Sequence, residues 1–108
     1  MAADARTTVR DLVPGQLVDS TFAVVRKDRR RPRNGSPYLA LELADRTGRV
    51  RATIFDDAPL LDGRFQAGDV IRVLGSVEEY RGRPQIVVRS IEPVEVAPDA
   101  LEIGRAHV

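Results

Sequence analysis

The residues in this sequence that are best suited to chemistry are arginines and aromatic rings. The segment Arg26–Arg33 holds six basic residues and one acid, a local charge of +5, although the net charge of the 108-residue chain is only +1. The rest of the chain therefore sums to −4. A basic segment on a mildly acidic body attracts a polyanion to one place. Because guanidinium groups bind phosphate oxygens and aromatic rings stack on bases, this combination predicts contact with a nucleic acid strand.

The candidate binding residues come from three parts of the chain. A single strand needs cations along its phosphates and flat surfaces for its bases. Tyr38 and Phe55 are the candidate stacking platforms, and Tyr80 is a further aromatic candidate in a predicted loop. The predicted nucleic-acid-binding residues are Arg26, Lys27, Arg29, Arg30, Arg31, Arg33, Tyr38, Arg49, Arg51, Phe55, Tyr80, Arg81 and Arg83.

Each of these groups also has a plainer interpretation. A basic run such as RKDRRRPR is typical of solvated loops and of nuclear-localisation signals. A cross-strand pair of rings such as Tyr38 and Phe55 stabilises a hairpin by about 0.2–1 kcal/mol without any ligand. Glu42 is expected to pair with Arg51 across two strands, and a surface ion pair of this kind adds little stability.

The sequence holds few groups suited to catalysis. It has no cysteine, which excludes a disulfide framework and thiolate metal sites. Its one histidine, His107, is the penultimate residue and stands apart from the aspartates that a metal cluster would need. We therefore predict no catalytic residue, no metal site and no cofactor in this chain. No apolar run is long enough to cross a bilayer or to serve as a signal region, so we expect a cytoplasmic protein without a membrane partner.

Short runs rich in valine and isoleucine, separated by turn residues, predict an all-β fold. The expected strands cover residues 17–25, 38–44, 49–55, 69–77 and 85–91. A short helix is expected within residues 57–65, with Asp56 or Asp57 as its N-cap. Five strands with one helix between the third and the fourth are the order of an OB-fold, a five-stranded Greek-key barrel. An SH3-like barrel is the alternative, which the position of the helix disfavours.

The second and third predicted strands indicate where the binding face lies. Their alternation predicts one set of core residues, Leu39, Leu41, Leu43, Val50, Ala52 and Ile54. The set on the outer face is Tyr38, Ala40, Glu42, Arg49, Arg51, Thr53 and Phe55. A tight turn that pairs Asp45 with Gly48 would set Tyr38 opposite Phe55. The basic run is expected in the loop before the second strand, and Arg81 and Arg83 in the loop between the last two. Elsewhere, Phe22 and Phe65 are predicted core residues.

Three segments of the chain together resemble a known family. They are GQLVDSTFAVVRKD, NGSPYLALELADRTGRVRATIFD and AGDVIRVLGSVEEYRGRPQIVVRSIEPV, and the likeness spans about residues 12–96. They resemble the N-terminal domain of the YhaM-type 3'-5' exoribonucleases. The resemblance implies an OB-fold that grips single-stranded nucleic acid, and it marks Tyr38, Phe55, Tyr80 and Gln85 as family positions. Phe55 stands where the relatives usually carry tryptophan, which leaves a smaller stacking platform. The arginine cluster is richer than the family pattern requires.

In that family, an HD domain with a bound divalent metal follows the OB-fold and performs the hydrolysis. No such domain is present in this chain, so a divalent metal is expected only in a missing HD domain. We divide the chain into an N-terminal extension, 1–11, the OB-fold domain, 12–96, and a tail, 97–108. Residues 102–108 can be encoded by the start of a common sequencing adapter. We hypothesise that they are an assembly artefact and that the natural protein continues.

The leading hypothesis is therefore a single-strand-binding module that delivers RNA or DNA to a 3'-5' exonuclease. An independent single-strand-binding protein, acting alone or as a homo-oligomer, is the second hypothesis. The third is an OB-type protein-interaction domain whose basic loop binds an acidic partner. Discrimination between RNA and DNA would depend on contacts with the 2'-hydroxyl, which have no sequence signature.

Overall fold

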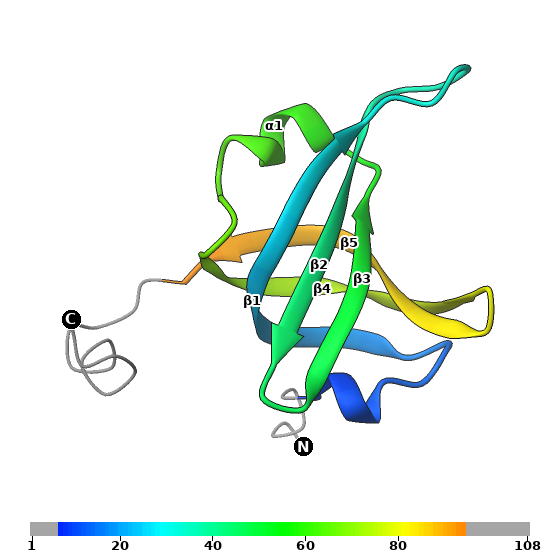
Figure 1. Ribbon diagram of the computed structural model, residues 1–108, viewed down its shortest axis with the longest axis vertical. Helices are drawn as coiled ribbons and strands as arrows, with labels where there is room; N and C mark the ends of the chain where they lie inside the picture. The colour runs from blue at the N-terminus through cyan, green and yellow to red at the C-terminus, as the bar shows by residue number, and fades with distance from the viewer. Residues whose placement is uncertain (1–6, 95–108) are drawn as a thin grey trace.

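The structure, a computed structural model, describes residues 7–94 and shows a closed five-stranded β-barrel (Figure 1). The strands are β1 (Leu17–Arg30), β2 (Tyr38–Asp45), β3 (Gly48–Ile54), β4 (Val70–Tyr80) and β5 (Arg83–Pro93). A 3-10 helix, η2 (Val9–Asp11), precedes the barrel, and a short α-helix, α1 (Ala58–Asp62), connects β3 to β4. This architecture confirms the predicted OB-fold order. The predicted tail, 97–108, lies outside the described residues.

The strands follow one another around the barrel in the order β1-β2-β3-β5-β4. Neighbouring strands are antiparallel except β3 and β5, which run parallel. The barrel closes where the first half of β1 pairs with β4, from Leu17 opposite Ser76 to Ala23 opposite Val70. The predicted register between β2 and β3 is confirmed, since Asp45 pairs with Gly48 and Ala40 with Thr53.

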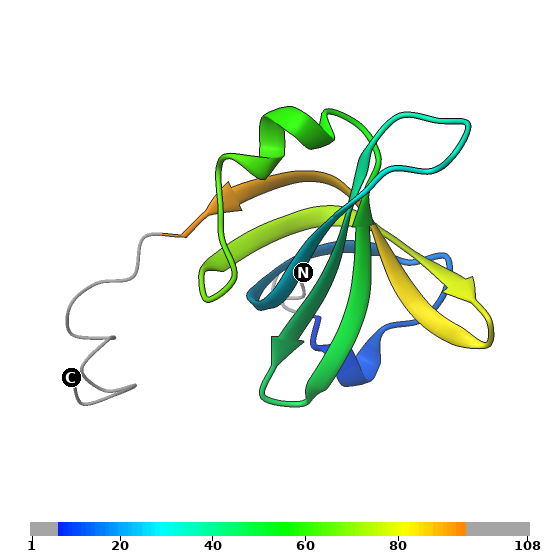
Figure 2. The ribbon, with the colours of Figure 1, turned by 45° about the horizontal axis from the view of Figure 1, so that its top comes forward.

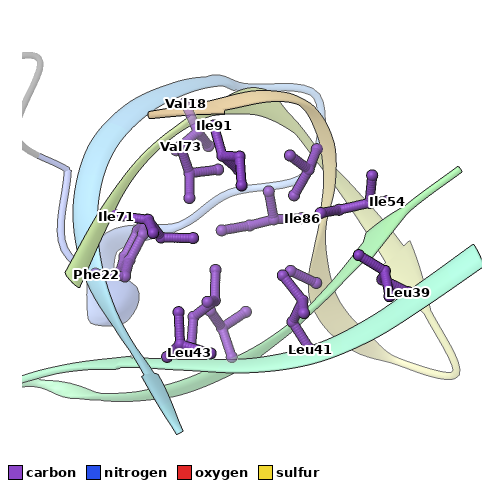
Figure 3. Close-up of a cluster of buried hydrophobic side chains, with 14 of the residues drawn as sticks. Val18, Phe22, Leu39, Leu41, Leu43, Ile54, Ile71, Val73, Ile86 and Ile91 are labelled. Atoms are coloured by element: carbon purple, nitrogen blue, oxygen red, sulfur yellow. The ribbon is translucent and has the colours of Figure 1, made fainter. Parts of the chain in front are cut away.

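The core is built from one face of every strand, as the period-two alternation predicts. Leu43, Ile54 and Ile86 are completely buried, and Phe22 and Phe65 are only 1% exposed. Figure 3 shows side chains from all five strands converging on this interior. The outer faces of β2 and β3 are consequently free to carry polar and aromatic side chains.

A β-bulge in β1 changes which side chains face outward. Val24 pairs with Leu43 and Arg26 pairs with Glu42, so Val25 has no partner on β2. Up to Val24 the even-numbered residues point inward; beyond the bulge, Arg26 and the residues in step with it point outward. The expectation that the whole basic run lies in a loop is wrong, because β1 continues to Arg30.

Helix α1 lies at one end of the barrel, next to the second half of β1 (Figure 2). It is shorter than predicted and packs Ala58 and Leu61 against the core. Asp57 occupies the N-cap position, as one of the two candidates, but its side chain makes no capping hydrogen bond. Its backbone is left-handed, with φ of 58°, which differs from the extended conformation that side-chain capping requires.

Strands β4 and β5 form a long, bent hairpin with a close backbone approach at Gly75. The backbone register shifts between Leu74 and Gly75, and a Cβ on Gly75 would lie only 2.2 Å from the Val87 carbonyl oxygen. Only glycine fits this contact without backbone movement. The bend directs the tip of the hairpin to the same side of the molecule as the tip of the β1–β2 hairpin (Figure 2).

Candidate nucleic-acid interface

A groove of about 1330 Å³ crosses the outer faces of β2 and β3. The second half of β1 and part of the loop after it border one side, and the tip of the β4–β5 hairpin borders the other. We call it the outer groove. Of the predicted binding residues, those that line it are Arg26, Arg30, Tyr38, Arg49, Arg51, Phe55, Tyr80, Arg81 and Arg83. The structure therefore brings together residues from three separate parts of the sequence.

The floor of the outer groove is arranged in rows across the strands. In the first row Arg30 pairs with Tyr38, and Phe55 follows β3 at the same level. In the second row Asp28, Ala40 and Thr53 are neighbours. In the third row Arg26, Glu42 and Arg51 are neighbours. The middle row thus carries short side chains, while rings stand on one side of it and arginines on the other.

Tyr38 and Phe55 form the aromatic end of the outer groove. Their ring centroids lie 5.4 Å apart, with an angle of 39° between the ring planes. The predicted contact between the two rings is confirmed. Phe55 is 54% exposed although it is apolar, and Tyr38 is half-buried. An exposed ring held by a neighbouring ring is a preformed surface for a flat ligand.

The arginines at the other end differ in their partners. Glu42 pairs with Arg49, with 3.3 Å between Oε2 and Nη1, and not with Arg51 as predicted. The register of Glu42 and Arg51 is nevertheless as expected, so the difference lies in the direction of the side chains. Among residues 7–94, Arg51 has no carboxylate partner and no hydrogen bond through its side chain. Its guanidinium is available to an anion in the groove.

Thr53 is more buried than its predicted place on the outer face implies. It belongs to the outward set of β3 and lines the outer groove, but only 7% of it is exposed. Its place in the second row, between Ala40 on β2 and Val87 on β5, explains this burial. It forms part of the floor of the groove and is not a protruding contact.

The tip of the β4–β5 hairpin supplies the opposite wall. Tyr80 pairs with Arg83, and the two connecting residues have positive φ values, 55° for Arg81 and 80° for Gly82. These angles are those of a type I′ turn, which matches the twist of antiparallel strands. The Arg81 guanidinium lies over the Tyr80 ring, 5.3 Å from its centroid, a cation–π contact at the mouth of the groove.

Lys27 and Arg29 are absent from the outer groove, although they were predicted with the others. They lie on the side of β1 that faces α1, beyond the bulge. The Lys27 ammonium lies 2.7 Å from Asp62 Oδ1 and donates to the carbonyl oxygens of Asp62 and Phe65. It also lies 4.7 Å from the centroid of the Phe65 ring. Arg29 donates to the second oxygen of the Asp62 carboxylate.

This cluster, Lys27, Arg29, Asp62 and Phe65, joins β1 to the end of α1. The side chains of Lys27 and Asp62 are each 11% exposed, so both charges are largely removed from water. The hydrogen bond from Lys27 holds the pKa of the Asp62 carboxyl below its usual value, against the opposing effect of burial. Arg31 and Arg33, in the exposed loop after β1, do not line the groove either.

Asp45 anchors η2 to the far end of the β2–β3 hairpin. It accepts hydrogen bonds from the backbone N–H groups of Val9 and Thr47 and from the Thr47 hydroxyl. Burial of the carboxyl acts to raise its pKa, but the hydrogen bonds together outweigh burial and lower it. This contact places Val9 at the edge of the outer groove.

Comparison with known proteins agrees with this geometry. The sequence model of a family described as the OB-fold nucleic acid binding domain matches residues 22–94. This chain belongs to that family. A 3'-5' exoribonuclease YhaM from Bacillus velezensis is 34% identical over 79 residues, which are 73% of this chain and 25% of the relative. The chain therefore spans about a quarter of the length of this relative.

Solved OB-folds superpose well on the domain. A crystal structure of a domain of replication protein A from Methanococcus maripaludis has a TM-score of 0.70 at 25% identity, covering 83% of this chain and 96% of that one. A replication protein A heterotrimer bound to ssDNA has a TM-score of 0.62 at 19% identity, covering 80% of this chain and 63% of that one. The second likeness shows the fold alone.

Neither a cluster of metal-ligating side chains nor a membrane-spanning helix occurs among residues 7–94. Within residues 7–94, no three histidine, cysteine, aspartate or glutamate side chains gather as a metal site. No helix in the same part of the chain is long and apolar enough to pass through a membrane.

Among the groove residues that sequence reasoning missed, the one with a charged side chain is Asp28. It was counted only as the single acid of the basic run, whereas the structure places it in the floor of the outer groove. A signal for the bulge that turns it outward exists in the sequence, because Val24 and Val25 are adjacent apolar residues that interrupt the alternation of β1.

Proposed function

We propose that the outer groove binds one strand of nucleic acid, with its bases against Tyr38 and Phe55 and its phosphates along the arginines. One observation carries the proposal: the contacting rings of Tyr38 and Phe55, the second of them exposed, share one outer face of the barrel with Arg51, which has no carboxylate partner among residues 7–94. Rings can stack only on bases that are not already stacked and paired in a duplex. The geometry therefore favours a single strand over a double helix.

Binding assays with labelled oligonucleotides test this proposal. Single-stranded and duplex oligonucleotides of about 15 nucleotides, which fits the usual range for one OB-fold, are titrated with the protein at several salt concentrations. We expect tighter binding to the single strand and a steep loss of affinity as salt rises, since each phosphate contact releases counterions. Equal binding to both forms, or none to either, would contradict the proposal and favour a protein partner.

We further propose that this domain holds the substrate for a 3'-5' exoribonuclease. The match to about a quarter of a longer exoribonuclease supports this place in a larger protein. Hydrolysis, with its divalent metal, would then belong to another domain. Sequencing the genomic locus downstream of codon 101 tests the idea. A reading frame that departs from residues 102–108 and continues into an HD domain is expected. A locus that encodes residues 102–108 followed by a stop codon after Val108 would contradict it.

A further inference from the structure

Asp28 is an acidic residue in a groove otherwise suited to phosphates. It stands on β1 between Arg26 and Arg30, in the outward-facing set that the bulge creates, and it pairs with Ala40 of β2. A carboxylate repels the phosphates of a bound strand, so it weakens the electrostatic part of binding. Phosphate binding therefore does not account for a carboxylate at this position in the floor.

The oxygens of Asp28 are free to accept hydrogen bonds. One of them, Oδ2, lies 3.6 Å from Arg26 Nε and 3.8 Å from Arg30 Nη2. Both distances are too long for hydrogen bonds, although the charges attract. Among residues 7–94 no group donates to this side chain, and 41% of it is exposed. An ionised carboxylate offers about four acceptor positions, and none of them accepts a hydrogen bond from a residue of the described range 7–94.

The surroundings of Asp28 suit the edge of a base. Tyr38 lies two residues from Ala40 along β2, about 7 Å away along the strand. A base stacked on the Tyr38–Phe55 pair would therefore extend over the short side chains of the middle row, with Asp28 at its β1 side. Bases in single strands are recognised on such exposed edges.

We propose that Asp28 recognises the Watson–Crick edge of the base held at Tyr38 and Phe55, and that it selects guanine. This inference rests on the proposed function of the outer groove. Guanine presents an imino N–H and an amino N–H side by side, so one carboxylate accepts two parallel hydrogen bonds from it. Adenine and cytosine present an amino group beside a ring acceptor. Uracil and thymine present an imino N–H between two carbonyl oxygens, which repel a carboxylate.

The test uses pyrimidine oligonucleotides that differ at a single base. A uridine or thymidine strand is compared with strands that carry one guanine, adenine, cytosine or inosine, at constant salt. Inosine keeps the imino N–H of guanine and lacks its amino group. We expect the wild-type protein to bind the guanine strand about fivefold or more tighter than the uniform strand, the lower limit for a good bidentate contact. Inosine should recover only part of this gain.

Asp28→Asn is the decisive variant, because it keeps the shape of the side chain and removes its charge. We expect this variant to lose the preference for guanine and the difference between guanine and inosine, while binding the uniform strand as well as the wild type or better. Glu92→Gln is the matched control, since Glu92 is an exposed carboxylate of β5 that does not line the outer groove. This control variant should retain the preference for guanine and the difference between guanine and inosine. Thermal unfolding of both variants verifies the fold.

The outcomes separate this inference from the proposed function. If the wild type binds all strands equally, or if Asp28→Asn keeps the guanine preference, the base-reading role of Asp28 is wrong while single-strand binding stands. An equal gain in affinity for every strand in Asp28→Asn, without a change in preference, would show that Asp28 only repels phosphates. If no single strand binds, both proposals fail together.

Discussion

Two pairs of basic residues alternate along the second half of β1. They carry the same charge, but they face different sides of the strand and have different carboxylate partners. Lys27 and Arg29 face α1, where the Asp62 carboxylate binds both of them. Arg26 and Arg30 face the outer groove, where their only carboxylate partner, among residues 7–94, is Asp28 at 3.6 Å or more. The first pair is held by a carboxylate of the protein, and the second lines the outer groove. For these four residues, the side of β1 determines the surroundings of the side chain.

The largest effect that we predict is a loss of stability in Lys27→Met, which removes the ammonium group on the α1 side of β1. Without the ammonium, the largely buried Asp62 carboxylate keeps only Arg29, and the carbonyl oxygens of Asp62 and Phe65 lose a donor. The free energy of unfolding should fall by about 2–3 kcal/mol, as measured by urea denaturation. The affinity of the folded variant for a single strand should stay the same. A stable Lys27→Met variant with weakened binding would reverse the assignment of Lys27.

At the aromatic end of the outer groove, substitution should weaken binding and leave the fold intact. Replacement of Tyr38 and Phe55 by alanine should weaken single-strand binding by about 1–3 kcal/mol for each base held. Both rings lie outside the core, so the fold should survive. Fluorescence anisotropy gives the affinity, and circular dichroism verifies the fold. An unchanged affinity in a folded variant would mean that the binding face is misassigned.

The two sides of β1 should also differ in the salt dependence of binding. For single strands, the slope of log affinity against log salt is about −0.7 for each phosphate neutralised. Arg26→Ala and Arg30→Ala should therefore each reduce the magnitude of the slope by about 0.7, with little change in stability, if each arginine contacts one phosphate. Arg29→Ala removes the same single charge from the other side of β1, so it is the matched control and should leave the slope unchanged. An equal reduction in all three variants would indicate a general electrostatic effect of the basic run.

Acid should weaken the contact between β1 and α1. Because the pKa of Asp62 is lowered in the folded state, its contribution to stability is complete above the usual aspartate pKa of about 3.9 and is lost as pH falls through the lower folded value. Asp45 behaves in the same way. Asp62→Asn should therefore be less stable than the wild type at pH 7, and the difference should shrink below about pH 4. Denaturation curves at both pH values measure it, and a constant difference would contradict the assignment.

Much of the fold follows from local patterns. The alternation of Leu39, Leu41 and Leu43 with outward residues predicts both the core and the outer face of β2, because the period of a strand is two. The tight turn after Asp45 sets the register of β2 and β3, and with it the contact of Tyr38 and Phe55. These features depend on interactions between residues that are close in sequence.

Other features of the site do not follow from strand alternation and turn residues. Glu42 has two arginines nearby and forms its ion pair with Arg49. The register of β2 and β3 alone does not determine which of the two it contacts. The partner of Lys27 lies 35 residues away, at the end of α1. No local pattern of charges indicates that contact.

Binary patterning and turn residues act over short distances, and they were enough to predict the barrel, its strands along the chain and the outer face of β2 and β3. Which basic residues of β1 can meet a ligand depends instead on how β1 pairs with β2. The reason is the bulge at Val25, where one extra residue exchanges the two faces of the strand. It turns Arg26, Asp28 and Arg30 into the outer groove and leaves Lys27 and Arg29 to hold α1.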